Sequence, residues 1–366
     1  MYNTIRSLAK CGAYILLAAL LLQQTLWYVV YNTFNTPVDS RVGTISPTPF
    51  RPLALYTFYR TKRVLIVGGT RGIGRGVAIA LAEQGASVTI VGRNNVNGVE
   101  TVKQLQALMR LPTQKFEYVA ADLGTSQGVL DLATRLHLEH GQFDEVVMTV
   151  SQWPNPAQPT TLSGHDRTIG VGVLSRFLLV RRLLETRLLT HGARVLSVYA
   201  STKVDVPAPP MEYIQSLLHK KTSFDGTMTS FVNVLGASSL VHDAMIQSTA
   251  KRYQGKITFI GMHPGLVVTD LLQGSILPRW MIPIAKLAMI PVSRSEESIG
   301  WIVAQILASE NVEHVAGGRN AYCYFNSLLQ GRKAQDRAYD NELQKWLEKE
   351  WFEDIYNTMK SVGSKK

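Results

Sequence analysis

Short apolar runs alternate with longer amphipathic stretches over most of the chain after residue 61. The apolar runs have the length and composition of buried strands, at 64–67, 87–91, 116–120, 146–150, 195–198 and 257–260. Between them, apolar residues recur at three- and four-residue steps, which predicts helices near 73–81, 99–109, 126–140, 164–190 and 235–252. Strands that are covered on both faces are continuously apolar, and parallel strands need helical crossovers. The pattern therefore predicts an α/β fold with a Rossmann-type, doubly wound parallel sheet in a single domain.

An uncharged segment precedes this domain. Residues 12–31 contain no charged side chain, and at roughly 1.5 Å per residue a helix of this length spans about 30 Å, the hydrocarbon thickness of a bilayer. Trp27, Tyr28 and Tyr31 suit a membrane interface. A cleaved signal peptide, a mitochondrial presequence and a buried core helix are the alternatives. We expect a transmembrane signal-anchor, whose orientation the flanking basic residues leave open.

The chain divides into five segments on this basis. The predicted boundaries are a basic tail at 1–11, the signal-anchor at 12–31, a Pro-rich spacer without a core of its own at 32–60, the Rossmann domain at 61–330, and a C-terminal amphipathic helix with its tail at 331–366.

Composition excludes several classes of protein. The chain has 366 residues, of which 46% are hydrophobic, so it can fill a sizeable core. Its 2 cysteines cannot form a disulfide framework or a four-cysteine zinc site, and no His, Asp or Glu cluster has metal-ligand spacing. The formal charge of +11 is spread along the chain without long basic runs. A phosphate-rich ligand or an anionic lipid therefore fits this charge better than nucleic acid does.

A glycine-rich turn follows the first predicted strand and leads directly into a helix. It comprises Gly68, Gly69, Thr70, Arg71, Gly72, Ile73 and Gly74. A backbone that turns sharply and approaches a diphosphate leaves no room for Cβ atoms, and the N–H groups at the helix start favour an anion. A glycine-rich loop that merely makes a tight turn is the alternative. Between a strand and a helix, the glycines predict a dinucleotide site.

The glycine spacing resembles that of the short-chain dehydrogenase/reductase family, although Val67 stands where the family usually has Thr. The resemblance covers roughly residues 61–325. It implies that Asp122 and Leu123 contact an adenine ring, and that the segment containing Pro264, Gly265 and Thr269 holds the nicotinamide carboxamide.

Charge near the second strand indicates which dinucleotide binds. NAD sites place a carboxylate at the end of this strand, whereas a 2′-phosphate needs a cation. The strand here ends in Arg93 with no acid nearby, and Arg71 lies in the glycine turn. A guanidinium group can form forked, charge-assisted hydrogen bonds to phosphate. We therefore predict NADP(H) as the cofactor.

The catalytic half of the resemblance is degraded. Carbonyl reduction in this family is attributed to a Tyr-x-x-x-Lys pair, a Ser and an Asn. The expected Asn position holds Gly172, the Ser position holds Ala200, and the stretch 231–239 contains neither Tyr nor Lys. The chain is therefore identified as a divergent member of the family.

Ser201, Tyr199 and Lys203 are the remaining candidates for catalysis. Tyr199 and Lys203 have the required spacing, but Lys203 lies 61 residues before Pro264 (264 − 203), further than the family's interval. Tyr199 also continues a strand, whose successive side chains point to opposite faces. The catalytic residues are thus unknown from the sequence.

These features predict a single-pass membrane protein of the endoplasmic reticulum or another endomembrane, with a mitochondrial location ranked behind. Its predicted activity is NADP(H)-dependent oxidoreduction of a lipophilic carbonyl or alcohol, because an apolar segment at 270–291 corresponds to the family's substrate lid. A catalytically inactive NADP(H)-binding scaffold or sensor at a membrane is the alternative. The expected partners are a small lipophilic substrate and a membrane, without nucleic acid and with homo-oligomers left open.

Overall fold

The computed structural model describes residues 39–45, 52–199, 208–265, 267, 282–283, 293–312, 322–334 and 336–363. The predicted membrane segment, 12–31, and the predicted lid, except for residues 282 and 283, lie outside these ranges. No helix within the described ranges is both long and apolar enough to cross a bilayer.

An eight-stranded sheet forms the centre of the domain, in the order β3-β2-β1-β4-β5-β6-β7-β8. The strands from β1 to β7 pair in parallel, and only the short β8 is antiparallel to its neighbour. Their bounds are β1 Arg63–Val67, β2 Ser87–Gly92, β3 Phe116–Ala120, β4 Phe143–Met148, β5 Leu189–Val198, β6 Ile257–His263, β7 Tyr322–Asn326 and β8 Gly331–Arg332. The order reverses between β1 and β4, as a doubly wound sheet requires. The predicted fold is confirmed.

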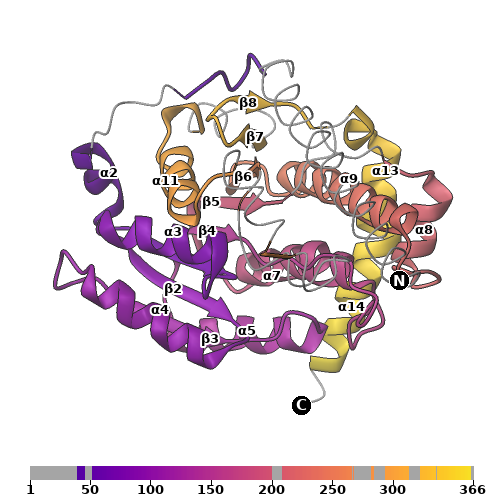
Figure 1. The fold of residues 1–366 in the computed structure, drawn as a ribbon, viewed down its shortest axis with the longest axis horizontal. Coiled ribbons are helices and arrows are strands. Elements are labelled where there is room, and N and C mark those ends of the chain that lie inside the picture. The colour runs from indigo at the N-terminus through magenta and orange to yellow at the C-terminus, as the bar shows by residue number, and fades with distance from the viewer. Residues whose placement is uncertain are drawn as a thin grey trace, which may run out of the picture.

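Helices cover both faces of the sheet (Figure 1). One face carries α2 Pro52–Tyr59, α3 Gly72–Glu83, α4 Asn95–Ala107 and α11 Glu296–Leu307. The other carries α5 Ser126–Glu139, α6 Arg167–Ile169, η1 Gly170–Leu174, α7 Ser175–Glu185, α8 Met211–Leu218 and α9 Met228–Arg252. The predicted helix 164–190 is shorter in the structure: α6, η1 and α7 run without a gap from Arg167 to Glu185, with a π-helical turn at η1, and β5 already begins at Leu189.

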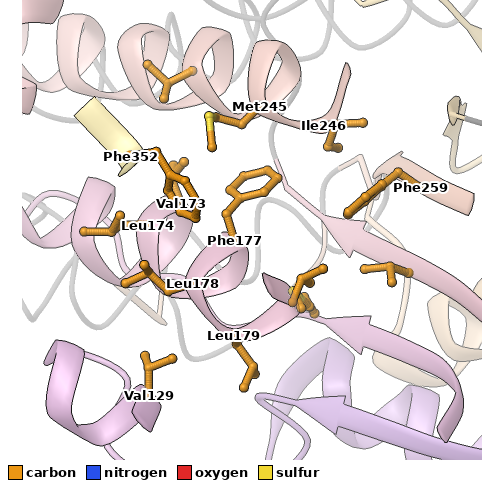
Figure 2. Packing of buried hydrophobic residues seen from close by; sticks show 14 of the residues in the cluster. Val129, Val173, Leu174, Phe177, Leu178, Leu179, Met245, Ile246, Phe259 and Phe352 are labelled. Atoms are coloured by element: carbon orange, nitrogen blue, oxygen red, sulfur yellow. The ribbon is translucent and has the colours of Figure 1, made fainter. Parts of the chain in front are cut away.

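A large apolar core lies between the sheet and the second group of helices. Figure 2 shows Phe177 of α7 projecting towards Met245 of α9, near Phe352 of the C-terminal segment. These side chains are almost completely buried. At about 25 cal/mol per Å² of apolar surface removed from water, such a core is the main source of stability.

The helix that begins at the glycine turn is fixed by a close crossing. α3 and α11 approach so tightly that a Cβ on Gly76 would lie 2.1 Å from the Glu296 carbonyl oxygen, and one on Gly300 would lie 2.2 Å from the Gly76 carbonyl oxygen. Tyr59 of α2 is buried on the same side and donates a hydrogen bond of 2.7 Å to the Ala304 carbonyl oxygen. The start of α3 is thus held by its neighbours.

Parts of the expected spacer pack against this domain. Val42 is buried in the apolar cluster around α3, and Asp39 N–H donates to the Gly331 carbonyl oxygen at 3.0 Å. The prolines of this region are the reason why the sequence predicts an extended spacer here. Pro52, however, occupies the first position of α2, where its missing N–H costs no hydrogen bond.

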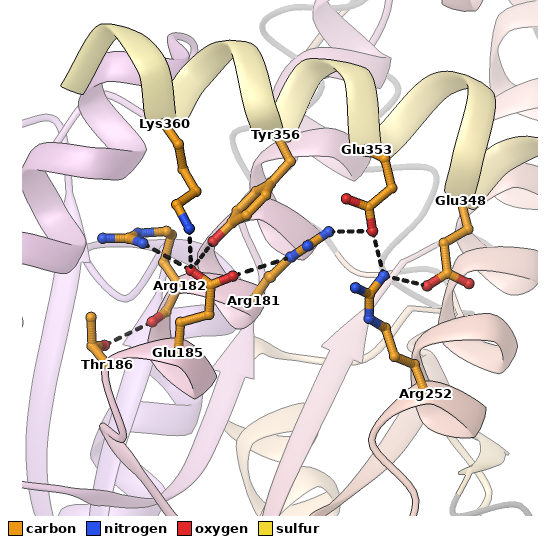
Figure 3. A network of polar contacts seen from close by, with 9 residues as sticks. All are labelled: Arg181, Arg182, Glu185, Thr186, Arg252, Glu348, Glu353, Tyr356 and Lys360. Atoms are coloured by element: carbon orange, nitrogen blue, oxygen red, sulfur yellow. Dashed lines mark hydrogen bonds and ion pairs between the residues drawn. The ribbon is translucent and has the colours of Figure 1, made fainter. Parts of the chain in front are cut away.

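The C-terminal segment folds back onto α5, α7 and α9 in the same chain. It contains η5 Asp336–Tyr339, α13 Asn341–Trp346, η6 Leu347–Phe352 and α14 Glu353–Gly363. Trp351 and Phe352 of this segment enter the core. Ion pairs connect this segment to α7 and α9: Figure 3 shows Glu353 between Arg181 and Arg252.

Candidate functional site

A cavity of about 530 Å³ lies beyond the carboxyl ends of β1, β2, β3 and β4. This is the edge of an open α/β sheet at which ligands bind. The residues of the glycine turn line the cavity, with the exception of Gly69. Arg93, Asp122 and Leu123, which were also predicted to contact the cofactor, line it too. The full lining is Gly68, Thr70, Arg71, Gly72, Ile73, Gly74, Val91, Gly92, Arg93, Asn94, Asn97, Ala121, Asp122, Leu123, Thr149, Val150, Ser151, Gln152 and Val171.

The glycine turn is shaped by its lack of side chains. Gly68 has φ +96° and Gly72 has φ +58°, conformations that L side chains rarely adopt. A Cβ on Gly68 would lie 2.7 Å from Thr149 Oγ1, and one on Gly74 would lie 2.2 Å from the Gly68 carbonyl oxygen. Arg71, at the N-cap of α3, forms no side-chain cap. The first N–H groups of α3 therefore remain available to an anion at the cavity wall.

Two guanidinium groups stand at the same cavity. Arg71 and Arg93 are both exposed and both line it. Within the described part of the chain, neither side chain has a hydrogen bond or an ion pair. Their charges are thus free for a phosphate group, as the NADP(H) prediction requires.

The walls of the cavity include residues that the sequence analysis did not select. Asn94 accepts a hydrogen bond of 2.9 Å from Asn97 N–H and so caps α4. Thr149 Oγ1 donates to the carbonyl oxygens of Val67 and Gly68, at 3.2 Å each, and ties the end of β4 to the glycine turn. Position alone could have found these residues, since they directly follow β2 and β4 at the ligand-binding edge.

The described residues of the predicted nicotinamide segment do not line the cavity. Pro264 and Gly265 follow β6, and Gly265 has φ +71°, but neither lines the cavity. Thr269 lies outside the described residues. The roles assigned to these positions stay predictions.

Of the catalytic candidates, only Tyr199 is described. Its hydroxyl group donates a hydrogen bond to Asp243 Oδ1, and its ring contacts that of His242 in a tilted arrangement with centroids 3.7 Å apart. Both partners belong to α9, so Tyr199 faces the layer beneath this helix and does not line the cavity. Ser201 and Lys203, with Ala200, lie outside the described residues.

Electrostatics disfavour proton transfer by this buried group at neutral pH. Burial, reinforced by Asp243, raises the pKa of Tyr199 well above its usual value. Burial, reinforced by the nearby positive charge of Arg176, lowers the pKa of His242 well below its usual value. The phenol is therefore a weak acid, and the imidazole is neutral.

The stretch 231–239, which was expected to carry the catalytic Tyr and Lys, begins with an aromatic side chain. Phe231, at the start of the stretch 231–239, packs edge-to-face on Trp153 with ring centroids 5.6 Å apart. It also contacts Phe224, at 6.2 Å. Gly172, in the expected Asn position, lies within the π-helical turn η1, where a Cβ would meet only Ser151 Oγ, at 3.7 Å. Trp153 directly follows Gln152, which lines the cavity.

The residues present fit a dinucleotide phosphate. The cavity has the volume of small-molecule and cofactor sites, which is typically about 300 to 1,000 Å³. Its floor is the glycine turn, in which a Cβ on Gly68 or Gly74 would clash with neighbouring atoms, and the unpaired cations of Arg71 and Arg93 stand beside it. These properties match the shape and charge of a diphosphate linked to a phosphorylated ribose.

Comparison with known proteins gives a consistent result. The short chain dehydrogenase family matches residues 62–210. Retinol dehydrogenase 12 of Homo sapiens is 28% identical over 219 residues, which cover 59% of this chain but only 65% of that protein, less than two thirds of its length. Protochlorophyllide reductase B of Hordeum vulgare is 23% identical over 340 residues, or 84% of each chain.

Solved structures share the fold. The Pseudomonas aeruginosa RhlG/NADP active-site complex superimposes with a TM-score of 0.53 at 21% identity, covering 76% of this chain and 97% of that one. This likeness shows the fold. The family model over residues 62–210 and the sequence relatives confirm that this part of the chain resembles the short-chain dehydrogenase/reductase family.

Proposed function

We propose that the protein is an NADP(H)-dependent oxidoreductase that acts on a lipophilic carbonyl or alcohol. The observation that carries the proposal is the cavity itself, in which the glycine turn and the unpaired side chains of Arg71 and Arg93 line one wall. Relatives and structural neighbours favour the same activity, since they include a retinol dehydrogenase and an NADP complex.

The described residues have distinct roles in this proposal. The N–H groups at the start of α3 bind the diphosphate, and Arg71 and Arg93 bind the 2′-phosphate. Asp122 and Leu123 lie at the adenine end, and Thr149 holds the turn closed through its hydrogen bonds to Val67 and Gly68. The bound dinucleotide supplies or accepts a hydride. The protein itself binds it, orients it and excludes water around it.

An apolar substrate suits the flank of the cavity. Gln152 lines the cavity, and the next residue, Trp153, joins the aromatic cluster with Phe231 and Phe224. Aromatic side chains favour apolar ligands because they bury a large surface. The uncharged segment 12–31 is consistent with the same substrate class, since an anchor in a membrane places the enzyme where lipophilic molecules concentrate.

The activity can be tested with the full-length chain. We expect substrate-dependent oxidation of NADPH, followed by its absorbance, with members of a panel of lipophilic ketones and aldehydes, or reduction of NADP⁺ with the corresponding alcohols. Rates with the same compounds and NADH are expected to be lower. A failure of the whole panel in both directions, with a nucleotide-binding protein, would contradict the proposal.

A non-catalytic NADP(H)-binding scaffold or sensor at a membrane is the second candidate. Phe231 stands in the stretch expected to hold the Tyr and Lys, and the hydroxyl group of Tyr199 is bound to Asp243 beneath α9. This candidate predicts the same nucleotide affinity without turnover, so binding and rate measurements on one preparation separate the two functions.

A further inference from the structure

Arg176 of α7 is buried between the ends of two strands. Only 2% of the surface of Arg176 is exposed to solvent. Nε and Nη2 donate to the Val150 carbonyl oxygen, at 3.2 and 2.5 Å, and Nη1 donates to the Val198 carbonyl oxygen at 2.9 Å. Nη1 also donates to Ser197 Oγ. The guanidinium group therefore clamps the carboxyl ends of β4 and β5.

The positive charge of this group lacks a carboxylate partner among the described residues. All acceptors of Arg176 are carbonyl or hydroxyl oxygens. Burial lowers the pKa of Arg176 to about 9, so the group stays protonated at neutral pH. Carbonyl oxygens satisfy its hydrogen bonds without neutralising its charge. A positive potential consequently extends into its surroundings, where the low dielectric screens it poorly.

The surroundings include one end of the cavity. Val150, whose carbonyl oxygen accepts the short hydrogen bond, lines the cavity. Arg93 and Asp122 line it at the ends of β2 and β3, on the other side of β1. A dinucleotide that crosses the point where strand order reverses has its adenosine half over β2 and β3, and its nicotinamide half over β4 and β5. Arg176 thus lies behind the nicotinamide end.

We propose that Arg176 makes the cavity bind the reduced dinucleotide more tightly than the oxidised one. This inference rests on the proposed function and deepens it. The nicotinamide ring carries a positive charge when oxidised and none when reduced, while the rest of the molecule is unchanged. A fixed cation behind the ring therefore repels only the oxidised form. Arg176 acts as a specificity-determining residue that favours carbonyl reduction when both forms compete.

The test is the ratio of two dissociation constants, measured by calorimetry on the full-length chain with NADPH and with NADP⁺. We expect the wild type to favour NADPH by about tenfold or more, the scale of one charge pair in a partly screened site. Arg176→Met is expected to lower this ratio several-fold. Arg176→Lys, which keeps the charge, is expected to retain most of it.

A matched control separates this effect from structural damage. Arg182→Met removes the same charge from the same helix, at a side chain that pairs with Glu185 and does not line the cavity (Figure 3). It is expected to leave the ratio unchanged. A merely structural role of Arg176 would weaken both forms equally and leave the ratio at its wild-type value, which would overturn the inference.

Two further outcomes are decisive even where Arg176→Met does not fold. A wild-type ratio near one would overturn the inference without any variant, while leaving the proposed function intact. Failure of the folded wild type to bind either form would instead overturn the proposed function, and this inference with it.

Discussion

The two ends of the sheet's carboxyl edge differ in how they present polar groups. Around β1, β2 and β3, the glycine turn, Arg71 and Arg93 face an open cavity, and the two arginines have no described partner. At the end of β5, the Tyr199 hydroxyl group is hydrogen-bonded to the fully buried Asp243 of α9. Polar groups of a binding site are accessible and have no partner within the protein, whereas polar groups with a structural role are buried and hydrogen-bonded. The contrast predicts a protein whose nucleotide site is intact and whose proton donor lies elsewhere than Tyr199.

The largest effect is expected at the glycine turn. Gly68→Ala adds a Cβ at φ +96° that meets Thr149 Oγ1 at 2.7 Å and Val150 N at 2.8 Å, so the turn must open. We expect NADPH affinity to fall by about 100-fold or more. Gly192→Ala is the matched control, because its φ of +77° gives similar backbone strain with no atom within 4 Å. Comparable losses of affinity in both variants would mean that strain, rather than the cavity floor, explains the result.

A side chain of β4, the strand between the two ends, is expected to affect the free energy of unfolding and not nucleotide binding. Glu145 is buried, neither carboxylate oxygen has a hydrogen bond among the described residues, and burial raises the pKa of Glu145 to about 8. The folded state therefore favours the protonated form. The contribution of the protonated Glu145 side chain to the free energy of unfolding is fully present below the unfolded-state pKa near 4.5, and it is lost as the pH rises through 8.

Glu145→Gln removes this loss. The variant and the wild type are expected to have similar free energies of unfolding near pH 4, and the variant is expected to be more stable by about 2 to 4 kcal/mol near pH 9. Urea unfolding across this range measures the difference. Glu100→Gln, at an exposed position of α4, is the control. A constant difference between Glu145→Gln and wild type at all pH values would contradict the assignment.

At the β5 end, Tyr199→Phe removes the hydroxyl group that donates to Asp243. We expect a loss of about 1 to 2 kcal/mol in the free energy of unfolding, because a buried acceptor loses its donor, and turnover within about twofold of wild type. Tyr324→Phe, whose hydroxyl group donates to the Asp243 carbonyl oxygen at 3.2 Å, is the matched control. A rate reduced by more than about tenfold in Tyr199→Phe alone, at unchanged stability, would place Tyr199 among the reacting groups.

The smallest effect is expected on the C-terminal edge, whose residues do not line the cavity. Glu348→Gln breaks an ion pair of 2.7 Å with Arg252 that is partly open to solvent (Figure 3). We expect a loss of at most about 0.5 kcal/mol in the free energy of unfolding, with nucleotide affinity unchanged. Glu350→Gln, which removes an exposed carboxylate nearby, gives the background value in the same thermal denaturation experiment.

Much of the nucleotide half could be predicted from the sequence because its signals are local. A short apolar strand, glycines and a helix start are neighbours in the chain, and Gly68, Arg71 and Gly74 are found together at the cavity. β7 was harder to predict, since its tyrosines carry hydroxyl groups whose partners, such as the Asp243 carbonyl oxygen, are distant in sequence. Arg176 and Arg181 are both arginines of α7, yet only tertiary contacts bury the first so completely. Pairing of this kind has no local signal.

The most direct test of the account compares the affinity of the full-length protein for NADPH and for NADH, in the wild type and in the Arg71→Met/Arg93→Met double variant, with Arg110→Met as an exposed control. The account predicts that the wild type binds NADPH more tightly by about 100-fold, that the double variant loses this preference through weaker NADPH binding alone, and that the control keeps it. Equal affinities in the wild type, or a preference that survives in the double variant, would contradict it.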